Sequence, residues 1–446
     1  MKTEFIQKSK KIFKIALPVM VQNLVGYLFI STDLAFIARY KEEGLSAVSS
    51  VTAPYFVLLS FMFAVGQGVT VLVSKAIGGN KKELGSRVAE NAIFMMQIFS
   101  FIYFFFWLFL GKKIVELMGA KGEVLAIGSD YISILAFIFL TMGTGIAVGA
   151  VFNGLGRTWP VMVISISKLL LNIFLNWLLI FGQWGFPELG VAGSALGTVI
   201  SEILGNIALF TIILNSSKLN VRIMGILRPS VKIMKRIVQV GFPVGIEYIL
   251  WSTGNAALIM ILNSINNMAA GYFGILNTLT NLSANIYNGI CVAALVMVAK
   301  AAGEKNRKEI MEVSKITLGY SLLICLLIGI IFILIPNDII SIFAKNGENI
   351  SYLAGMLFIV FLISIPKAIN IMGGGFIRGT GNTKWMMYTQ FFGVLVHLPI
   401  AWTLAITLNM GLFGILIAVF LDEFLRGVVN YGKFLHSQRV KVEIES

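Results

Sequence analysis

The chain contains apolar runs of about 20 residues along its whole length. A helix of about that length crosses a hydrocarbon core about 30 Å thick, and lipid admits only helices and closed barrels as spanning structures. The composition agrees, because 57% of the residues are hydrophobic and 13% are charged, whereas soluble chains average about 25% charge. No stretch alternates with the period of a barrel strand. We therefore predict an all-α polytopic membrane protein.

We predict twelve spans, six in each half of the chain. They lie near 12–38, 48–73, 91–110, 124–152, 160–182, 190–215, 235–262, 270–298, 315–336, 350–375, 384–408 and 411–435. On this assignment 27 lysines and arginines fall on one side of the membrane and 6 on the other, with every arginine in or beside a loop. Basic loops stay in the cytoplasm, so we expect cytoplasmic termini in the cell (inner) membrane. The net charge of +14 then indicates no nucleic-acid partner.

Rare residues recur at a constant spacing, which indicates an internal duplication. At an offset of 225 the pairs are Pro18 and Pro243, Lys75 and Lys300, Gly154 and Gly379, Gly156 and Gly381, and Trp177 and Trp402. After a loop shorter by four residues, Gly190, Gly193 and Glu202 pair with Gly411, Gly414 and Glu423 at an offset of 221. We predict an N-lobe (1–215), a cytoplasmic linker (216–236) and a C-lobe (237–446). Six spans per lobe predict a pseudo-two-fold axis along the membrane normal, with a cavity between the lobes.

Polar groups inside the spans are the candidates for function. Asp33 lies in the first span, where a carboxylate costs roughly 3 kcal/mol or more unless it faces a cavity or a partner. Oxygen-bearing side chains at a similar predicted depth follow on the fifth and sixth spans, namely Asn172, Asn176, Ser194 and Thr198. A hard monovalent cation needs several such oxygens, whereas a proton needs only the carboxylate. We predict a cation-coupling site here, with Na⁺ held by Asp33, Asn172 and Asn176 as one possibility.

Several motifs resemble those of the MATE multidrug exporters. They are FNGLGRT (152–158), its copy IRGTGNT (377–383), NIFLNWLLIFG (172–182), GVAGSALGTVIS (190–201), and a proline followed fifteen residues later by Asp33. The resemblance implies twelve helices in two lobes and export of organic, often cationic compounds in exchange for Na⁺ or H⁺. It also implies that the coupling cation binds in the N-lobe, where Asp33 matches the key acid. Some members carry Asp where this chain has Asn176.

Glu247, in the seventh span, has two interpretations. It replaces Gln22 in the repeat, and family members with an acid on this span carry it near this position, sometimes one turn further on, where this chain has Trp251. Glu247 could therefore be a second cation site. The alternative is a salt bridge to Lys367, which would cancel that role.

A substrate cavity is predicted from the remaining polar groups. The eighth span carries asparagines spaced 4, 4 and 3 residues apart, which places them on one helical face. That face should line a cavity or pack on another helix, because lipid-facing amides are costly. His397 is the repeat partner of Asn172 and could titrate near neutrality. The predicted cavity residues are Gln22, Gln67, Trp251, Asn277, Asn281, Asn285, Asn288 and His397.

The sequence favours a secondary antiporter over the other classes. A flippase for a lipid-linked or amphipathic substrate, from the same superfamily, is the main alternative, although the arginines near loops argue against it. A channel would need a filter-like loop, and an enzyme would need a nucleophile–histidine pairing or paired metal ligands, which the sequence lacks. We expect a monomer in the lipid bilayer, a small organic substrate, a coupling cation and no cofactor.

Overall fold

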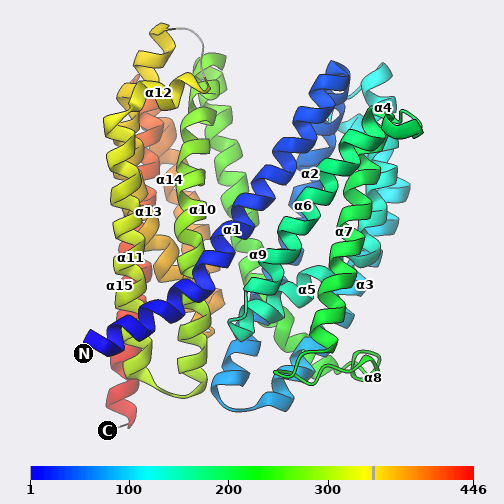
Figure 1. Ribbon diagram of the computed structural model, residues 1–446. Helices are drawn as coiled ribbons and strands as arrows, with labels where there is room; N and C mark the ends of the chain where they lie inside the picture. The colour runs from blue at the N-terminus through cyan, green and yellow to red at the C-terminus, as the bar shows by residue number, and fades with distance from the viewer. Residues whose placement is uncertain (1, 344–346, 446) are drawn as a thin grey trace. The chain divides into compact units, whose positions relative to one another are not determined.

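A computed structural model describes residues 2–343 and 347–445, and these fold almost entirely into helices (Figure 1). Eleven helical segments of the described chain are long and apolar enough to cross a membrane. Most are single helices: α1 (Lys2–Tyr40), α2 (Glu42–Gly78), α3 (Lys82–Leu117), α6 (Trp159–Ile180), α7 (Gly190–Leu214), α9 (Val231–Ile265), α10 (Asn267–Gly303), α11 (Arg307–Leu334) and α13 (Gly347–Thr380). The other two are composite: α4 (Gly122–Leu135), η1 (Ala136–Ile138) and α5 (Phe139–Leu155) form one, and α14 (Thr383–Trp402) and η3 (Thr403–Thr407) the other.

A twelfth long helix, α15 (Gly411–Glu445), carries three charged residues within its apolar stretch, Asp422, Glu423 and Arg426. Each predicted span coincides with one of these twelve segments, so the predicted all-α membrane fold is confirmed. The helices mostly extend beyond the predicted spans, because their polar first and last turns continue past the apolar part. Short elements between them are η2 (Gln183–Gly185), α8 (Ile223–Ile226) and α12 (Pro336–Ser341).

The chain forms two compact units, whose boundaries fall inside helices. The first unit is Val21–Gly245, and the second combines the chain up to Met20 with the chain from Ile246 onward. The predicted lobes instead divide in the linker, 216–236. Both boundaries follow a proline inside a helix, Pro18 in α1 and Pro243 in α9, where the missing N–H and the ring interrupt the helical hydrogen bonds.

Each unit is built around one central helix segment. In the first unit α5 packs on α2, α3 and α7, and α6 packs on α7. In the second unit α13 packs on α10, α11 and α15, and α14 packs on α15 (Figure 1). Under the repeat, α5 corresponds to the end of α13. The central helix segment is therefore the same repeated segment in both units.

The duplication extends to individual backbone positions. Gly156 and Gly381 end the paired helices with φ of 70° and 92°, a left-handed conformation that glycine adopts without steric cost. Gly154 lies so close to α2 that a Cβ would stand 2.9 Å from the Thr70 carbonyl oxygen. Gly379 lies equally close to α10, with a Cβ 3.0 Å from the carbonyl oxygen of Leu295, the repeat partner of Thr70. Glycine is needed in both copies for the same close helix contact.

Candidate functional site

Asp33 lies at the centre of a buried polar cluster in the first unit. Asn176 Nδ2 donates to Asp33 Oδ1 at 2.5 Å, and Thr198 Oγ1 donates to Asp33 Oδ2 at 3.0 Å. Asn172 Nδ2 donates to Thr198 Oγ1 at 3.1 Å, and its Oδ1 accepts from Asn176 Nδ2 at 3.3 Å. The structure therefore brings together four of the residues predicted for cation coupling, from α1, α6 and α7. Ser194 is fully buried nearby on α7, but its hydroxyl has no hydrogen-bond partner.

Two glycines of α7 allow α6 to approach closely enough to build this cluster. A Cβ on Gly193 would stand 2.6 Å from the Leu179 carbonyl oxygen, and one on Gly197 would stand 3.0 Å from Asn176 Oδ1. The two glycines are four residues apart, so they share one face of α7. Because this face carries no side chain at these two positions, α6 lies close to α7 and the amide of Asn176 reaches Asp33.

The electrostatics of the cluster are unusual for a buried carboxylate. Asp33 is 7% exposed, and it forms no ion pair with any residue that the structure describes. Its partners are neutral amides and a hydroxyl, and Asn176 Oδ1 is buried without a hydrogen-bond partner. Buried carboxylates are normally paired with a cation. The arrangement therefore offers one negative charge and several neutral oxygens to a small cation.

A cavity of about 280 Å³ opens beside Asp33 within the same unit. Asp33, Thr198 and Gln22 contribute polar groups to its wall, and Gln22 also donates to the Thr158 carbonyl oxygen at 3.1 Å. The rest of the wall is mainly apolar and aromatic, with Val25, Phe29, Leu34, Tyr55, Phe56, Leu59, Phe63 and Met142 among its residues. Gln67 lies outside this lining.

An ion pair that was not predicted from the sequence borders the same cavity. Lys168 Nζ lies 2.6 Å from Glu202 Oε2 and donates to Asn206 Oδ1 at 3.2 Å. The sequence did contain a signal for this pair. Glu202 recurs in the repeat as Glu423, and Lys168 lies at a comparable depth on the adjacent helix. Lys168 neutralises Glu202, which leaves Asp33 as the unpaired carboxylate of the cavity wall.

Glu247 lies in the second unit, where its ion-pair partner is Arg378 and not Lys367, the partner expected under the second interpretation. Arg378 Nη2 donates to Glu247 Oε1 at 2.6 Å, and both side chains are nearly buried. Lys367 instead donates to Asn281 Oδ1 at 3.3 Å and forms no ion pair among the described residues. Arg378 was expected beside a loop, yet it lies in α13 before the turn at Gly381 and reaches back to α9.

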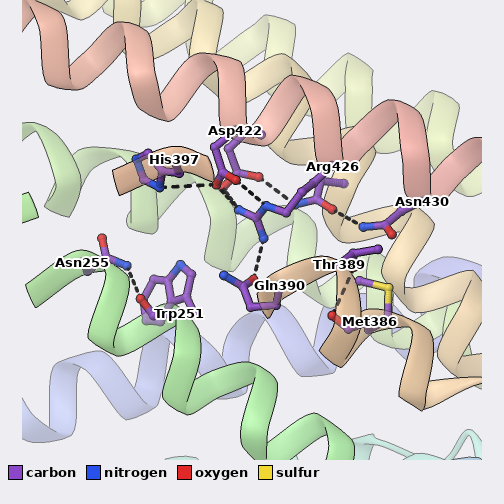
Figure 2. A network of polar contacts seen from close by, with 11 residues as sticks. Trp251, Asn255, Met386, Thr389, Gln390, His397, Asp422, Arg426 and Asn430 are labelled. Carbon is purple, nitrogen blue, oxygen red and sulfur yellow. Dashed lines mark hydrogen bonds and ion pairs between the residues drawn. The ribbon is translucent and has the colours of Figure 1, made fainter. Parts of the chain in front are cut away.

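The second unit also holds a dense charged network (Figure 2). Arg426 contacts Asp422 through two nitrogens, at 2.9 Å and 2.5 Å, and donates to Gln390 Oε1 at 2.5 Å. It lies 3.6 Å from Glu423, and His397 Nδ1 lies 3.9 Å from Asp422. Arg426 lies inside α15, so the expectation that every arginine falls in or beside a loop is wrong. The i, i+4 spacing of Asp422 and Arg426 within an apolar run was the signal for this pair.

Glu423 belongs to a chain of amides beside this network. Asn370 Nδ2 donates to Glu423 Oε2 at 2.8 Å, and Asn430 Nδ2 donates to Asn370 Oδ1 at 2.8 Å. Trp385 Nε1 donates in turn to Asn430 Oδ1 at 3.0 Å. The amides and the tryptophan connect α13, α14 and α15, so this part of the network ties three helices together.

The residues predicted for a substrate cavity divide between the two units. In the second unit Trp251, Asn277 and His397 line a cavity of about 50 Å³, together with Lys367 and Asp422. Asn281 donates to Asn277 Oδ1 at 3.4 Å. Asn285 and Asn288 line neither this cavity nor the one beside Asp33. The predicted chamber between the two lobes stays a prediction.

Comparison with known proteins decides the family. The family model MatE matches residues 18–178 and again residues 243–403. The chain belongs to the MatE family. The two matches are 225 residues apart, the offset found in the sequence, and the predicted resemblance to MATE proteins is confirmed.

Relatives of this MatE chain include transporters with drug-related names. It is 30% identical to the probable multidrug resistance protein NorM of Thermotoga maritima, over 97% of this chain and 94% of the relative. It is 23% identical to the multidrug export protein MepA of Staphylococcus saprophyticus, over 91% of this chain and 88% of the relative. As a member of this family the chain is a multi-pass membrane transporter and not an enzyme.

Solved structures show the same fold. MATE in the bent conformation superposes with a TM-score of 0.90 at 19% identity, covering 98% of this chain and 97% of that one. An outward-facing multidrug resistance MATE family transporter of the MOP superfamily gives a TM-score of 0.88 at 19% identity, covering 97% and 96%. At these identities the likeness concerns the fold alone.

In the last helix pair of each unit, α6 with α7 and α14 with α15, the repeated positions carry a cation and a glycine on opposite helices. We call this an exchange. In the first unit Lys168 of α6 packs over Gly205 of α7. Their repeat partners are Gly393 of α14 and Arg426 of α15, and here a Cβ on Gly393 would stand 2.8 Å from Arg426 Cδ. Each unit therefore places one cation beside its repeated glutamate, but from opposite helices.

A second exchange accompanies the first. Asn206 of α7 packs against Gly145 of α5, so closely that a Cβ on the glycine would collide with the amide. Their repeat partners are Gly427 and Asn370, so in the second unit the amide lies on the other helix. A Cβ on Gly427 would stand 3.6 Å from Asn370 N. In the first exchange a long side chain packs on a glycine in both units, whereas in the second Gly427 faces the backbone of Asn370 and not its side-chain amide.

Proposed function

We propose that this transporter is a secondary antiporter that exports organic, often cationic and amphipathic compounds in exchange for Na⁺ or H⁺. Two relatives named for multidrug resistance or export support the drug-export part of this proposal. The observation that carries the coupling part is Asp33, a buried carboxylate without an ion pair among the described residues, beside a largely apolar cavity. Intramembrane acids of this kind mark ion and proton pathways.

Asp33 can take up either candidate ion. A sodium ion would find the two Asp33 oxygens, Asn172 Oδ1, the unpartnered Asn176 Oδ1 and the hydroxyl of Thr198 within one cluster. Carbonyl, carboxylate and hydroxyl oxygens suit hard cations. A proton would need only Asp33, because the protonated carboxyl has a single O–H to donate and the Thr198 hydroxyl can turn from donor to acceptor to receive it. The cluster therefore supports a cation site and leaves Na⁺ and H⁺ as alternatives.

Cation uptake can drive export by alternating access. Neutralising Asp33 removes the charge that faces the amide of Asn176, and Pro18, fifteen residues earlier in α1, supplies a hinge. A ligand shifts such an equilibrium only by its different affinities for the two states. One inward charge at 100 mV supplies about 2.3 kcal/mol, which is roughly a fortyfold concentration ratio at 1.4 kcal/mol per decade. One ion per cycle is sufficient for useful extrusion.

The test is Asp33→Asn in proteoliposomes, with Na⁺ and pH gradients imposed separately. We expect the variant to lose gradient-driven export of a cationic dye, while the wild type responds to one of the two gradients. Glu116→Gln is the control, because Glu116 is an exposed carboxylate in the same unit and lies outside the predicted spans. Export by Asp33→Asn at the wild-type rate under either gradient would refute the coupling role.

A flippase for an anionic amphipathic substrate is the second candidate, and one observation favours it. Lys367 is 7% exposed, lines the cavity of about 50 Å³ and forms no ion pair among the described residues. Arg378 and Arg426, by contrast, are neutralised by Glu247 and Asp422. If the same proteoliposomes move a fluorescent lipid-linked diphosphate, and do so without an ion gradient, this second candidate replaces the first.

A further inference from the structure

The segment between α7 and α9 is fixed against the first turns of α3. Its backbone N–H groups donate to α3 side chains at three points: Asn220 N to Ser86 Oγ at 3.0 Å, Arg222 N to Glu90 Oε1 at 3.1 Å, and Ser230 N to Asn91 Oδ1 at 2.6 Å. Leu219, Val221 and Ile226 of this segment are themselves buried. This segment therefore has a defined structure and holds its side chains in place.

A cavity of about 570 Å³, here called the linker pocket, lies between this segment and α3. Five cations line it: Lys82, Arg87, Lys218, Arg222 and Arg228. Two acids also line it, Glu83 and Glu90. Among the residues that the structure describes, Arg87 is the one of the five cations within ion-pair distance of an acid, at 3.8 Å from Glu90. The linker pocket therefore carries an excess of three positive charges, which attracts anions.

The position of the linker pocket along α3 matches the level of lipid headgroups. The apolar run of α3 begins at Ala92, and Arg87 precedes it by five residues, which is about 7.5 Å along a helix axis. The polar layer on each side of a bilayer is about 5 to 7.5 Å thick, from a core of about 30 Å and a total of 40 to 45 Å. Arg87 therefore lies at the outer part of the layer that holds the lipid phosphates.

Exposed apolar side chains lie beside these cations. On and next to α8, Ile223 is 58% exposed, Met224 61% and Leu227 64%. Gly225 lies directly against the Glu90 carboxylate, where a larger residue would collide, so α8 is held with these three residues outward. Large apolar groups next to basic ones are the composition of segments that lie in the membrane interface.

We propose that the linker pocket binds the phosphate of an anionic phospholipid from the bilayer around the protein. Lys218, Arg222 and Arg228 surround the headgroup, and Ile223, Met224 and Leu227 insert beside its acyl chains. A soluble polyanion would use the charges but would leave the three apolar residues in water. The adjacent bilayer satisfies both sets of residues, which is why a lipid is the occupant that the surface fits.

Native mass spectrometry of protein released from nanodiscs tests the charges. The nanodiscs contain phosphatidylcholine with or without phosphatidylglycerol, and the variant is Lys218→Gln/Arg222→Gln/Arg228→Gln. Each neutralised residue should lower affinity about fivefold (about 1 kcal/mol), so the triple variant should retain phosphatidylglycerol on the order of 100-fold more weakly. The matched control is Lys112→Gln/Lys113→Gln/Lys121→Gln, which removes the same charge near the other end of α3, and it should retain phosphatidylglycerol like the wild type.

Equal losses in the two triple variants would overturn the site, because they would show only a general charge effect. Displacement of the lipid by inorganic phosphate at millimolar concentration would also overturn it, since a free anion would then suffice. Retained phosphatidylglycerol that resists phosphate, and that is lost only in the linker variant, supports the proposal.

A spin label at Met224→Cys tests the apolar half of the proposal. The native Cys291 and Cys325 are buried, so labelling should be selective, and replacing both with Ser gives a background check. We expect the label to be more accessible to oxygen than to a water-soluble nickel chelate in nanodiscs with phosphatidylglycerol. A label that stays more accessible to the chelate would place α8 in water and overturn the insertion of its side chains.

Discussion

The polar centres of the two units differ in their electrostatics although their helices repeat. In the first unit Asp33 is surrounded by neutral amides and a hydroxyl and has no ion pair among the described residues. In the second unit Asp422 and Glu423 face Arg426, and Asp422 is held by two contacts. The same scaffold thus holds an unneutralised acid in one copy and a closed charge network in the other. Both copies keep a cation beside the repeated glutamate, and Leu258 stands where the repeat places Asp33. Duplication therefore preserved the helix packing and this pair, while the unneutralised acid is found in the first unit.

Breaking the closed network should have the largest effect. Arg426→Met leaves Asp422 and Glu423 buried without their cation, and loss of one partner of a buried pair costs about 3 to 5 kcal/mol. We expect a loss of free energy of unfolding in that range, measured by unfolding in mixed micelles. Adding Asp422→Asn to this variant should recover most of the loss, because one of the orphaned charges is then removed.

The exposed Arg236 supplies the control for this substitution. Arg236→Met should change the free energy of unfolding by no more than about 0.5 kcal/mol, as most surface substitutions do. An equally small change for Arg426→Met would mean that the network of the second unit does not stabilise the fold. The proposed difference between the two units would then be wrong.

The ion pair of the first unit should matter less. Lys168→Met leaves Glu202 without its cation, but the Glu202 side chain is 19% exposed and borders the cavity, so water can solvate it. We expect a loss of about 1 to 3 kcal/mol, within the cost of an unsatisfied buried group. The double variant Lys168→Met/Glu202→Gln should be more stable than the single one. A loss as large as that of Arg426→Met would show that water does not solvate Glu202, and that the two units bury their ion pairs equally well.

The smallest effect on stability is expected at Asp33. Asp33→Asn removes a buried charge that no cation balances, so the free energy of unfolding should stay within about 1 kcal/mol of the wild type or rise, since neutralising an unpaired buried charge relieves a desolvation cost. The same unfolding measurement checks it, alongside the transport assay. A strongly destabilised Asp33→Asn would show that Asp33 serves the fold, and its transport defect would then have a structural cause.

The fold was predictable because both of its signals can be read along the sequence without knowing which residues are neighbours in space. Apolar length gives the spans, and constant offsets such as that between Gly156 and Gly381 give the duplication. The cluster around Asp33 was predictable because depth along three spans can be counted from their ends. The partner of Glu247 was not predictable, since depth does not say which face of a helix a residue occupies, and Arg378 was counted with its nearest loop. Arg426 was also counted with its nearest loop, although its i, i+4 spacing from Asp422 was visible in the sequence.

The exchange of Lys168 and Gly205 for Gly393 and Arg426 has a consequence for how such halves are aligned. Compared column by column, lysine opposite glycine and glycine opposite arginine score as two unrelated mismatches. Taken as a pair, the two columns hold one cation and one glycine in each half, so what survives duplication is a property of the helix pair. Searches for inherited charge in duplicated bundles should therefore score facing positions jointly.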